Sequence, residues 1–333
     1  MILHPAVIAL LMGSLLVALM ILYSAFWSYK IIDGWDLQSG SEGQLALEKK
    51  TYLVSTLMTY AFGFQILSFF LFVYLTDDLH RLFVGAMCAA GTLNVNENGY
   101  PAVVLKVLNC LLAGVWLVLN HTDNQASDYP LIRKKYALLL AIVPFLLAET
   151  EQQWSYFLNL KANVITSCCG SLFSTEEEGV AAGLAALPVI PMQVAFFGIM
   201  ALILASGVWF LLKGRGGKLF AVVGTLTFPV SIAALISFIS LYFYELPTHH
   251  CPFCILQREY QYVGYLIYTT LLGGGIASAG MWALMPFRPV PSLQEALPLI
   301  QRSLAATALV LYSVFTVVVI CRIVFSDFTL MGY

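Results

Sequence analysis

Charged residues are scarce in this sequence. Asp, Glu, Lys and Arg make up 10% of the 333 residues, whereas about 25% is usual in a soluble domain. The formal net charge is −2, and no basic stripe offers nucleic acid an electrostatic surface. The low charge therefore excludes an ordinary soluble domain, and we expect no nucleic-acid partner.

Hydrophobic residues make up 60% of the chain, and apolar runs of about 20 residues or more recur along it. Each run is long enough to cross roughly 30 Å of hydrocarbon as a helix. Only helices and closed barrels satisfy their backbone in lipid, and these runs lack the alternation of barrel strands. The sequence thus predicts an all-α polytopic membrane protein, surrounded by lipid, with eight spans near 6–29, 52–76, 102–121, 136–157, 189–213, 219–244, 256–285 and 303–326.

The spans predict three regions along the chain. Residues 1–135 hold three spans, with residues 83–100 as an outer interfacial or re-entrant segment. The first run has neither a basic segment before it nor a cleavage site after it, so we interpret it as a retained helix. Residues 136–285 hold spans four to seven as a four-helix bundle, and residues 286–333 hold the last span.

Lysine and arginine predict the orientation, because they are enriched in cytoplasmic loops. Eleven of them fall on one side, in or beside the loops 30–51, 122–135, 214–218 and 286–302. Both termini then lie outside. We expect an integral protein of the bacterial inner membrane with its termini on the periplasmic side.

Five of the seven cysteines are predicted to lie in outer loops. Cys110 and Cys321 fall within spans, where a thiol usually packs as a small hydrophobe. The outer compartment is where disulfides persist. The outer-loop cysteines are Cys88, Cys168, Cys169, Cys251 and Cys254.

Cys251-Pro-Phe-Cys254 has a C-x-x-C spacing, typical of reversible redox pairs or of half a metal site. We expect it at the start of a helix, where the helix dipole and Arg258, one turn on, favour a thiolate at Cys254. A structural bridge is the alternative. The vicinal Cys168–Cys169 pair is compatible with a redox relay, a soft-metal site or a structural bridge.

A metal site is the first rival interpretation. His249, His250, Cys251 and Cys254 together offer two imidazoles and two thiols, which suit copper(I) or zinc. Cys168 and Cys169 are candidates to complete it. The second rival is a non-catalytic subunit bound to other membrane subunits, because a four-helix enzyme needs neither the first three spans nor the last.

The stretch from Ser240 to Tyr268, SLYFYELPTHHCPFCILQREYQYVGYLIY, resembles the quinone-linked membrane enzymes of the DsbB and vitamin K epoxide reductase families. The arginine four residues after the second cysteine is similar to the DsbB pattern. The order of a loop cysteine pair before the C-x-x-C is similar to the epoxide reductase family. The resemblance covers about residues 136–285. The adjacent loop cysteines, His249-His250 and the lack of a fused thioredoxin-like domain depart from it.

This resemblance implies a thiol–disulfide oxidoreductase. Electrons would pass from an extracytoplasmic thioredoxin-like dithiol protein to Cys168 and Cys169, then to Cys251 and Cys254, and finally to a membrane quinone. The residues expected around the quinone are Arg258, Gln257, Tyr262 and Glu149.

Glu149 and Glu151 interrupt the outer part of span four. Ionisable groups inside a span are costly and often functional. Lys106, in span three, is a candidate partner for these acids. The alternative to a functional role is that the helix leaves the membrane near them.

Overall fold

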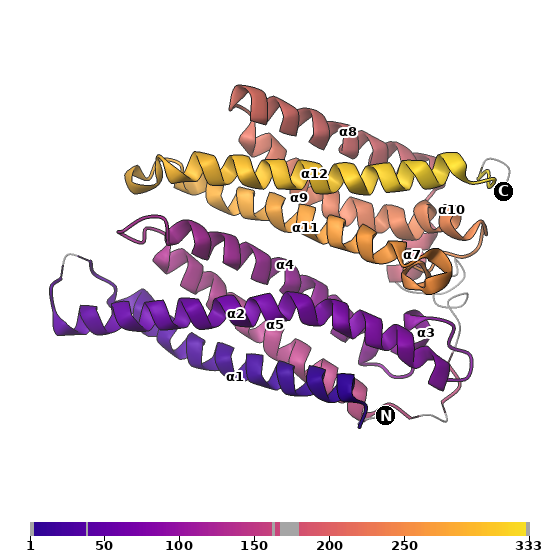
Figure 1. Ribbon diagram of the computed structural model, residues 1–333, viewed down its shortest axis with the longest axis horizontal. Coiled ribbons are helices and arrows are strands. Elements are labelled where there is room, and N and C mark those ends of the chain that lie inside the picture. Colours follow the sequence, from indigo (N-terminus) through magenta and orange to yellow (C-terminus); the bar gives the residue numbers. More distant parts are fainter. Residues whose placement is uncertain (1–2, 38, 162–163, 167–179, 331–333) are drawn as a thin grey trace. The chain divides into compact units, whose positions relative to one another are not determined.

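The computed structural model of the protein describes residues 3–37, 39–161, 164–166 and 180–330, and all regular elements among them are helical (Figure 1). Seven helices are long and apolar enough to cross a membrane. The chain is therefore an all-helical integral membrane protein. The seven are α1 (Pro5–Gly34), α2 (Glu42–Asp78), α4 (Gly99–Asp123), α8 (Val189–Lys213), α9 (Gly217–Ala234), α11 (Val263–Leu284) and α12 (Ala296–Phe325).

The expected count of eight spans is met only in part. The fourth predicted span forms α5 (Ile132–Leu158), but this helix is not among the seven apolar ones. Its ends carry the charges, with Arg133, Lys134 and Lys135 at one end and Glu149 and Glu151 near the other. Seven helices thus satisfy the apolarity of a span, and α5 is an eighth long helix.

Shorter elements connect the long helices. Residues 83–98 contain only α3 (Ala89–Leu93), which is far too short to cross a membrane. Helix α9 continues through a π-helical turn, η2 (Leu235–Ile239), into α10 (Ser240–Tyr244). The remaining short elements are η1 (Leu79–Leu82), α7 (Val180–Ala185), η3 (Cys254–Leu256), η4 (Arg258–Tyr260), η5 (Met285–Phe287) and η6 (Pro291–Leu293).

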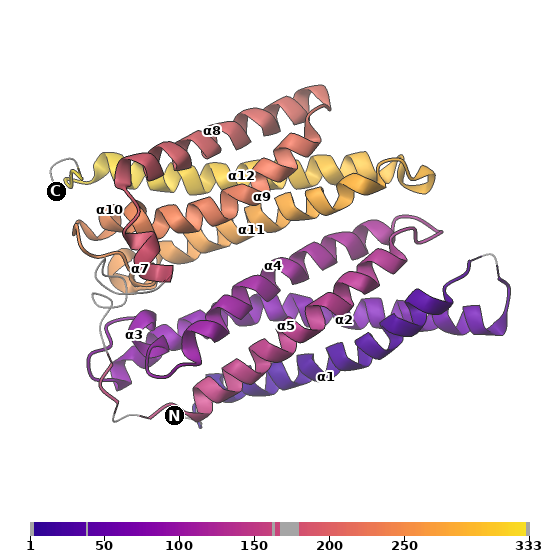
Figure 2. The ribbon, with the colours of Figure 1, turned by 180° about the vertical axis from the view of Figure 1, so that it is seen from behind.

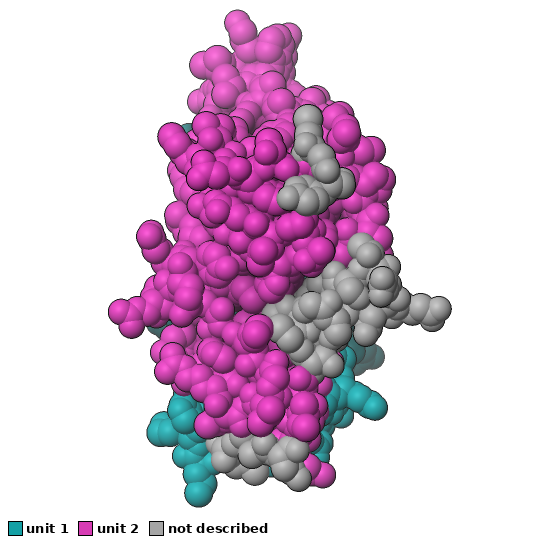
Figure 3. All heavy atoms as spheres, turned by 90° about the vertical axis from the view of Figure 1, so that its right-hand side faces the viewer, with its two compact units in different colours: residues 1–73, 96–160, 283–301 teal, residues 74–95, 161–282, 302–333 magenta. Residues whose placement is uncertain are grey.

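The chain divides into two compact units, coloured separately in Figure 3. Unit 1 contains residues 1–73, 96–160 and 283–301, and unit 2 contains residues 74–95, 161–282 and 302–333. This division differs from the expected bundle of spans four to seven. Helix α5 packs against α1 and α4 within unit 1, so the bundle of unit 2 is completed by α12 instead.

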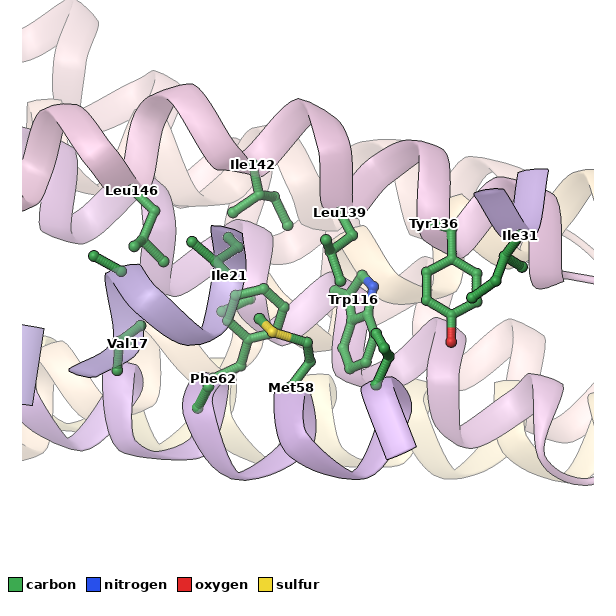
Figure 4. Close-up of a cluster of buried hydrophobic side chains, with 14 of the residues drawn as sticks. Val17, Ile21, Ile31, Met58, Phe62, Trp116, Tyr136, Leu139, Ile142 and Leu146 are labelled. Atoms are coloured by element: carbon green, nitrogen blue, oxygen red, sulfur yellow. The ribbon is translucent and has the colours of Figure 1, made fainter. Parts of the chain in front are cut away.

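Figure 2 shows helices α1, α2, α4 and α5 of unit 1 side by side. Apolar side chains of these helices build the core of the unit (Figure 4). The rings of Phe62 and Trp116 meet edge to face with their centroids 5.2 Å apart. The indole of Trp116 also donates a hydrogen bond to the Lys135 carbonyl at 3.0 Å. The central contacts involve Val17, Ile21, Met58, Phe62, Trp116, Tyr136, Leu139, Ile142 and Leu146.

Small residues bring the helices of unit 2 close together. A Cβ at Gly207 of α8 would lie 2.6 Å from Leu309 of α12, and one at Gly274 of α11 would lie 2.9 Å from the Tyr312 ring of α12. The Tyr312 hydroxyl donates to the Gly224 carbonyl of α9 at 2.8 Å. Close packing at small residues is how helices associate in lipid, and it explains why α12 joins this bundle.

Two buried ion pairs join α4 to α5 within unit 1. Lys106 and Glu149 are 2.7 Å apart, which confirms Lys106 as the partner of that acid. Asp123 and Lys135 are also 2.7 Å apart. The side chains of all four are at most 3% exposed. Because the lysine lies on α4 in one pair and on α5 in the other, only one antiparallel register satisfies both pairs.

The Lys106–Glu149 pair predicts a strong effect of Glu149→Gln, because the change leaves a buried lysine without its counter-charge. We expect a loss of about 3 kcal/mol in the free energy of unfolding, measured by denaturant titration in detergent. Glu151→Gln changes an exposed acid on the same helix and is the matched control. Removing both charges while keeping an acceptor for Gln65 and Asn109, as in Lys106→Met with Glu149→Gln, should cost less than Glu149→Gln alone. Equal stability of Glu149→Gln and Glu151→Gln would contradict the pairing.

Candidate functional site: a buried cysteine cluster

Three cysteines of unit 2 meet in the folded chain. The sulfur atoms of Cys88, Cys251 and Cys254 all lie within 4.8 Å of one another. The Cys88 and Cys251 sulfurs are 3.7 Å apart, well beyond the about 2.05 Å of a disulfide bond, so they are in non-bonded contact. The three residues are 0%, 0% and 6% exposed, respectively. Loops separated by more than 160 residues thus share one buried site.

A tight turn places Cys88. Gly85 has φ +91°, and a Cβ there would lie 2.2 Å from the Thr166 carbonyl oxygen, so glycine is required. Thr166 binds the same segment again, since its hydroxyl donates to the Gly91 carbonyl at 2.8 Å. Cys88 itself is extended and directly precedes α3. The carboxylate of Asp77 accepts the Ala89 N–H at 3.1 Å and thereby holds the start of this short helix.

Gln257 ties the Cys88 turn to the C-x-x-C segment. Its side-chain amide donates to the Met87 carbonyl at 2.7 Å and lies 3.4 Å from the Asp77 carboxylate. Gln257, three residues after Cys254, therefore holds the backbone of the residue before Cys88. From the sequence we expected Gln257 near a quinone. In the structure its side chain binds the turn that carries Cys88.

Tyrosine hydroxyls hold the C-x-x-C loop by its backbone. The Tyr244 hydroxyl donates to the Cys251 carbonyl at 2.5 Å and accepts the Ile255 N–H at 3.1 Å. The Tyr268 hydroxyl donates to the Pro252 carbonyl at 2.5 Å. A fourth contact reaches the sulfur itself, because the Phe253 N–H donates to Cys251 Sγ at 3.4 Å. An N–H pointing at a sulfur favours its thiolate form.

The expected position of the C-x-x-C at a helix start was wrong. Helix α11 begins only at Val263, and Gln257 is extended between the two short turns η3 and η4. Gln261 and Tyr262 then adopt φ values of 55° and 56°, which no helix continues through. The dipole of α11 therefore does not act on Cys254, and Arg258 does not lie one α-helical turn beyond it.

The two adjacent histidines make different contacts. His249 Nε2 lies 3.3 Å from Cys254 Sγ, and its ring meets the Tyr244 ring edge to face at 4.4 Å. His250 Nδ1 donates to the Ile236 carbonyl at 2.9 Å. Ile236 lies in the π-helical turn η2, where the altered spacing leaves a carbonyl to be bound from outside the helix. His249 thus borders the cluster, while His250 stabilises the preceding helix.

The other predicted site residues are more dispersed. Arg258 is exposed and Tyr262 is half exposed, both in the connection before α11. Glu149 belongs to unit 1, where Lys106, Gln65 and Asn109 bind its two oxygens. The structure therefore does not place Glu149 in the cluster.

Nearby ionisable groups complete the surroundings. Burial and the neighbouring Cys254 raise the pKa of Tyr260. Glu245 pairs with Arg322 at 3.1 Å. Arg322 also donates to the Tyr242 and Phe243 carbonyls, so it caps α10 just before the cysteine segment.

Of the remaining cysteines, the structure describes two, and neither belongs to this group of three. Cys168 and Cys169 lie outside the described residues. Cys110 is buried in α4 of unit 1, and Cys321 is exposed on α12. Cys88 is the member that sequence reasoning left without a role. Its only signal was its place in a loop predicted to lie on the same side as the C-x-x-C.

The fold and site define an all-helical membrane protein with a buried three-cysteine cluster. No protein-family model, curated protein or solved structure matches the chain.

Proposed function

We propose that this protein is a membrane thiol–disulfide oxidoreductase whose redox-active pair is Cys251 and Cys254. The observation that supports it is the 3.7 Å contact between the sulfurs of Cys88 and Cys251, with Cys254 beside them. Thiol–disulfide exchange requires one sulfur to approach another along a short path. A cysteine from a second loop, held against a C-x-x-C, is the arrangement that such exchange needs.

The exchange balances within the cluster. When Cys251 and Cys254 form a disulfide, two thiols lose two electrons and two protons. A Cys88 thiolate that attacks the Cys251 sulfur forms a Cys88–Cys251 bond and releases Cys254 as a thiolate. The electrons enter from an extracytoplasmic thioredoxin-like dithiol protein, directly or through Cys168 and Cys169. Because the three cysteines of the cluster are buried, the partner must reach them through a more exposed cysteine or after a local opening.

A membrane quinone is the proposed electron acceptor, and it becomes the quinol by taking up two electrons and two protons. Arg258 and Tyr262 are exposed where the chain enters the apolar helix α11. The guanidinium of Arg258 has no ion pair among the described residues. It is therefore available to stabilise a reduced quinone oxygen. Glu149 is omitted from this site because three donors already bind its oxygens.

The proposed location is the bacterial inner membrane, with the cluster at its periplasmic face. The meeting of Cys88 with the C-x-x-C supports a common side for their two loops, and the distribution of lysine and arginine favours the outer side. Disulfide chemistry is sustained in that compartment.

Trapping the thiol state tests the proposal directly. Protein purified in air, acid-quenched and alkylated should contain a Cys251–Cys254 disulfide when its peptides are mapped by mass spectrometry, and quinone should restore this bond after reduction. Cys321→Ser, which alters an exposed cysteine of α12, serves as the control and should leave the bond unchanged. Recovery of both cysteines as alkylated thiols, with quinone present and metal absent, would exclude the redox function.

Arg258 tests the quinone in particular. Arg258→Gln should slow quinone-dependent reoxidation by about 1–3 kcal/mol in activation free energy, the contribution of one charged hydrogen bond. Oxidation by a small chemical oxidant should be unchanged, because the cysteines remain in place. Glu259→Gln alters the neighbouring exposed side chain and is the control. Unaltered quinone kinetics in Arg258→Gln would remove this residue from the acceptor site.

A further inference from the structure

We infer that the reduced cluster binds one soft d10 metal cation, zinc(II) or copper(I), through the sulfurs of Cys88, Cys251 and Cys254. His249 is placed to supply a fourth ligand. The inference uses the same sulfurs as the proposed function but does not require that they exchange disulfides. It also differs from the set of His249, His250, Cys251 and Cys254 that the sequence offered as a rival interpretation.

The sulfur spacing fits a shared cation. A zinc–sulfur bond is about 2.3 Å, so two sulfurs on a tetrahedral zinc lie about 3.8 Å apart. The Cys88 and Cys251 sulfurs are 3.7 Å apart. The other two sulfur–sulfur distances are at most 4.8 Å. Three sulfurs at such distances match one face of a coordination tetrahedron more closely than they match a bonded pair.

His249 approaches the cluster from the side of Cys254. Its Nε2 lies 3.3 Å from Cys254 Sγ, close to the separation of two ligands on one zinc ion. The Tyr244 ring lies against its imidazole and limits its movement. Zinc prefers four ligands, whereas copper(I) is satisfied by soft thiolates. His249 should therefore matter more for zinc than for copper(I).

His250 is excluded from the ligand set by its own contact. Its Nδ1 donates to the Ile236 carbonyl. Neither histidine belongs to the group of mutually close ligand atoms, but only His249 has a ring nitrogen against a cluster sulfur. Cys88 takes the place that the sequence offered to this second histidine. The resulting set of three thiolates and one imidazole is a common composition of structural zinc sites.

Burial and the surrounding hydrogen bonds favour a cation at this position. Buried charges in proteins are usually paired or coordinate metals, and a metal allows several buried thiols to lose their protons together. The Phe253 N–H already points at Cys251 Sγ. Gln257 and Asp77 hold the Cys88 loop in place around the sulfurs. These outer contacts orient the ligands before any ion binds.

Metal binding and disulfide formation exclude each other. A Cys251–Cys254 disulfide removes two of the three thiolates, and a bound cation removes the attacking thiolate from exchange. The cation would therefore hold the cluster in its reduced state. Each thiol that becomes a ligand also releases a proton, so apparent affinity should rise with pH.

Metal titration of the full chain tests the inference. Protein in detergent, reduced with a non-thiol reductant, would be titrated anaerobically with zinc(II), with copper(I) and with cobalt(II) as a spectroscopic probe of thiolate ligation. We expect one ion per chain and a sulfur-to-cobalt absorption band. Cys88→Ser should abolish this band, whereas Cys110→Ser and Cys321→Ser should leave it intact. His249→Gln should weaken zinc binding at least tenfold and leave copper(I) binding nearly unchanged.

A second readout on the unaltered protein covers variants that fail to fold. Stoichiometric zinc should protect Cys88, Cys251 and Cys254 from alkylation together, while Cys321 stays reactive and chelation restores labelling of all three. Binding that survives Cys88→Ser, or protection that omits Cys88, would overturn the inference. Disulfide mapping is read separately: metal binding without a Cys251–Cys254 disulfide would reject only the redox function, and the disulfide without metal binding would reject only this inference.

Discussion

The structure depends on one constraint, which is that polar groups enclosed by apolar helices must find partners within the protein. With only 10% charged residues in the chain, each buried charge strongly restricts the possible packing. In unit 1 the Lys106–Glu149 and Asp123–Lys135 pairs set the register of α4 against α5. An unpaired charge in that position would cost about 3–5 kcal/mol. The ion pairs thus specify the helix arrangement that the apolar residues then fill.

The same constraint shapes the cysteine cluster in unit 2. The segments around Cys88 and Cys251 contain irregular backbone, whose buried N–H and carbonyl groups need partners. Tyr244, Tyr268 and Gln257 bind several of these groups from helices and turns alongside. These three side chains hold the cysteine segments by backbone groups rather than by the sulfurs. Such a scaffold keeps its geometry while the thiols change state, which both a redox pair and a metal site require.

Much of the fold followed from the sequence. Low charge and long apolar runs predicted the class and the approximate position of every long helix, because these features act locally along the chain. The grouping of helices did not follow, since the close contacts at Gly207 and Gly274 that bring α12 into unit 2 involve residues far apart in sequence. From the sequence we placed the start of α11 too early in the chain. The left-handed turn at Gln261 and Tyr262 contains no glycine, the residue that usually indicates such a turn.

The candidate site was predicted only in part, because local sequence features identify its cysteines but not the contacts between distant segments. The C-x-x-C spacing identified Cys251 and Cys254, and the distribution of charge placed Cys88 in a loop on the same side. The contact of Cys88 with Cys251 depends on the turn at Gly85 and on Gln257, neither of which has a distinctive motif. The separate roles of His249 and His250 depend on the π-helical turn at Ile236, which no local pattern indicated.

The central claim is that Cys88 and Cys251 occupy one site. It is tested most directly by a chain that keeps only these two cysteines, with the other five replaced by serine. Treatment of the folded protein with a small diffusible oxidant should yield an intramolecular Cys88–Cys251 disulfide, mapped by mass spectrometry. A matched chain that keeps only Cys88 and Cys321 should form none. Failure of the Cys88–Cys251 pair to crosslink in folded protein, or equal crosslinking of both pairs, would contradict the account.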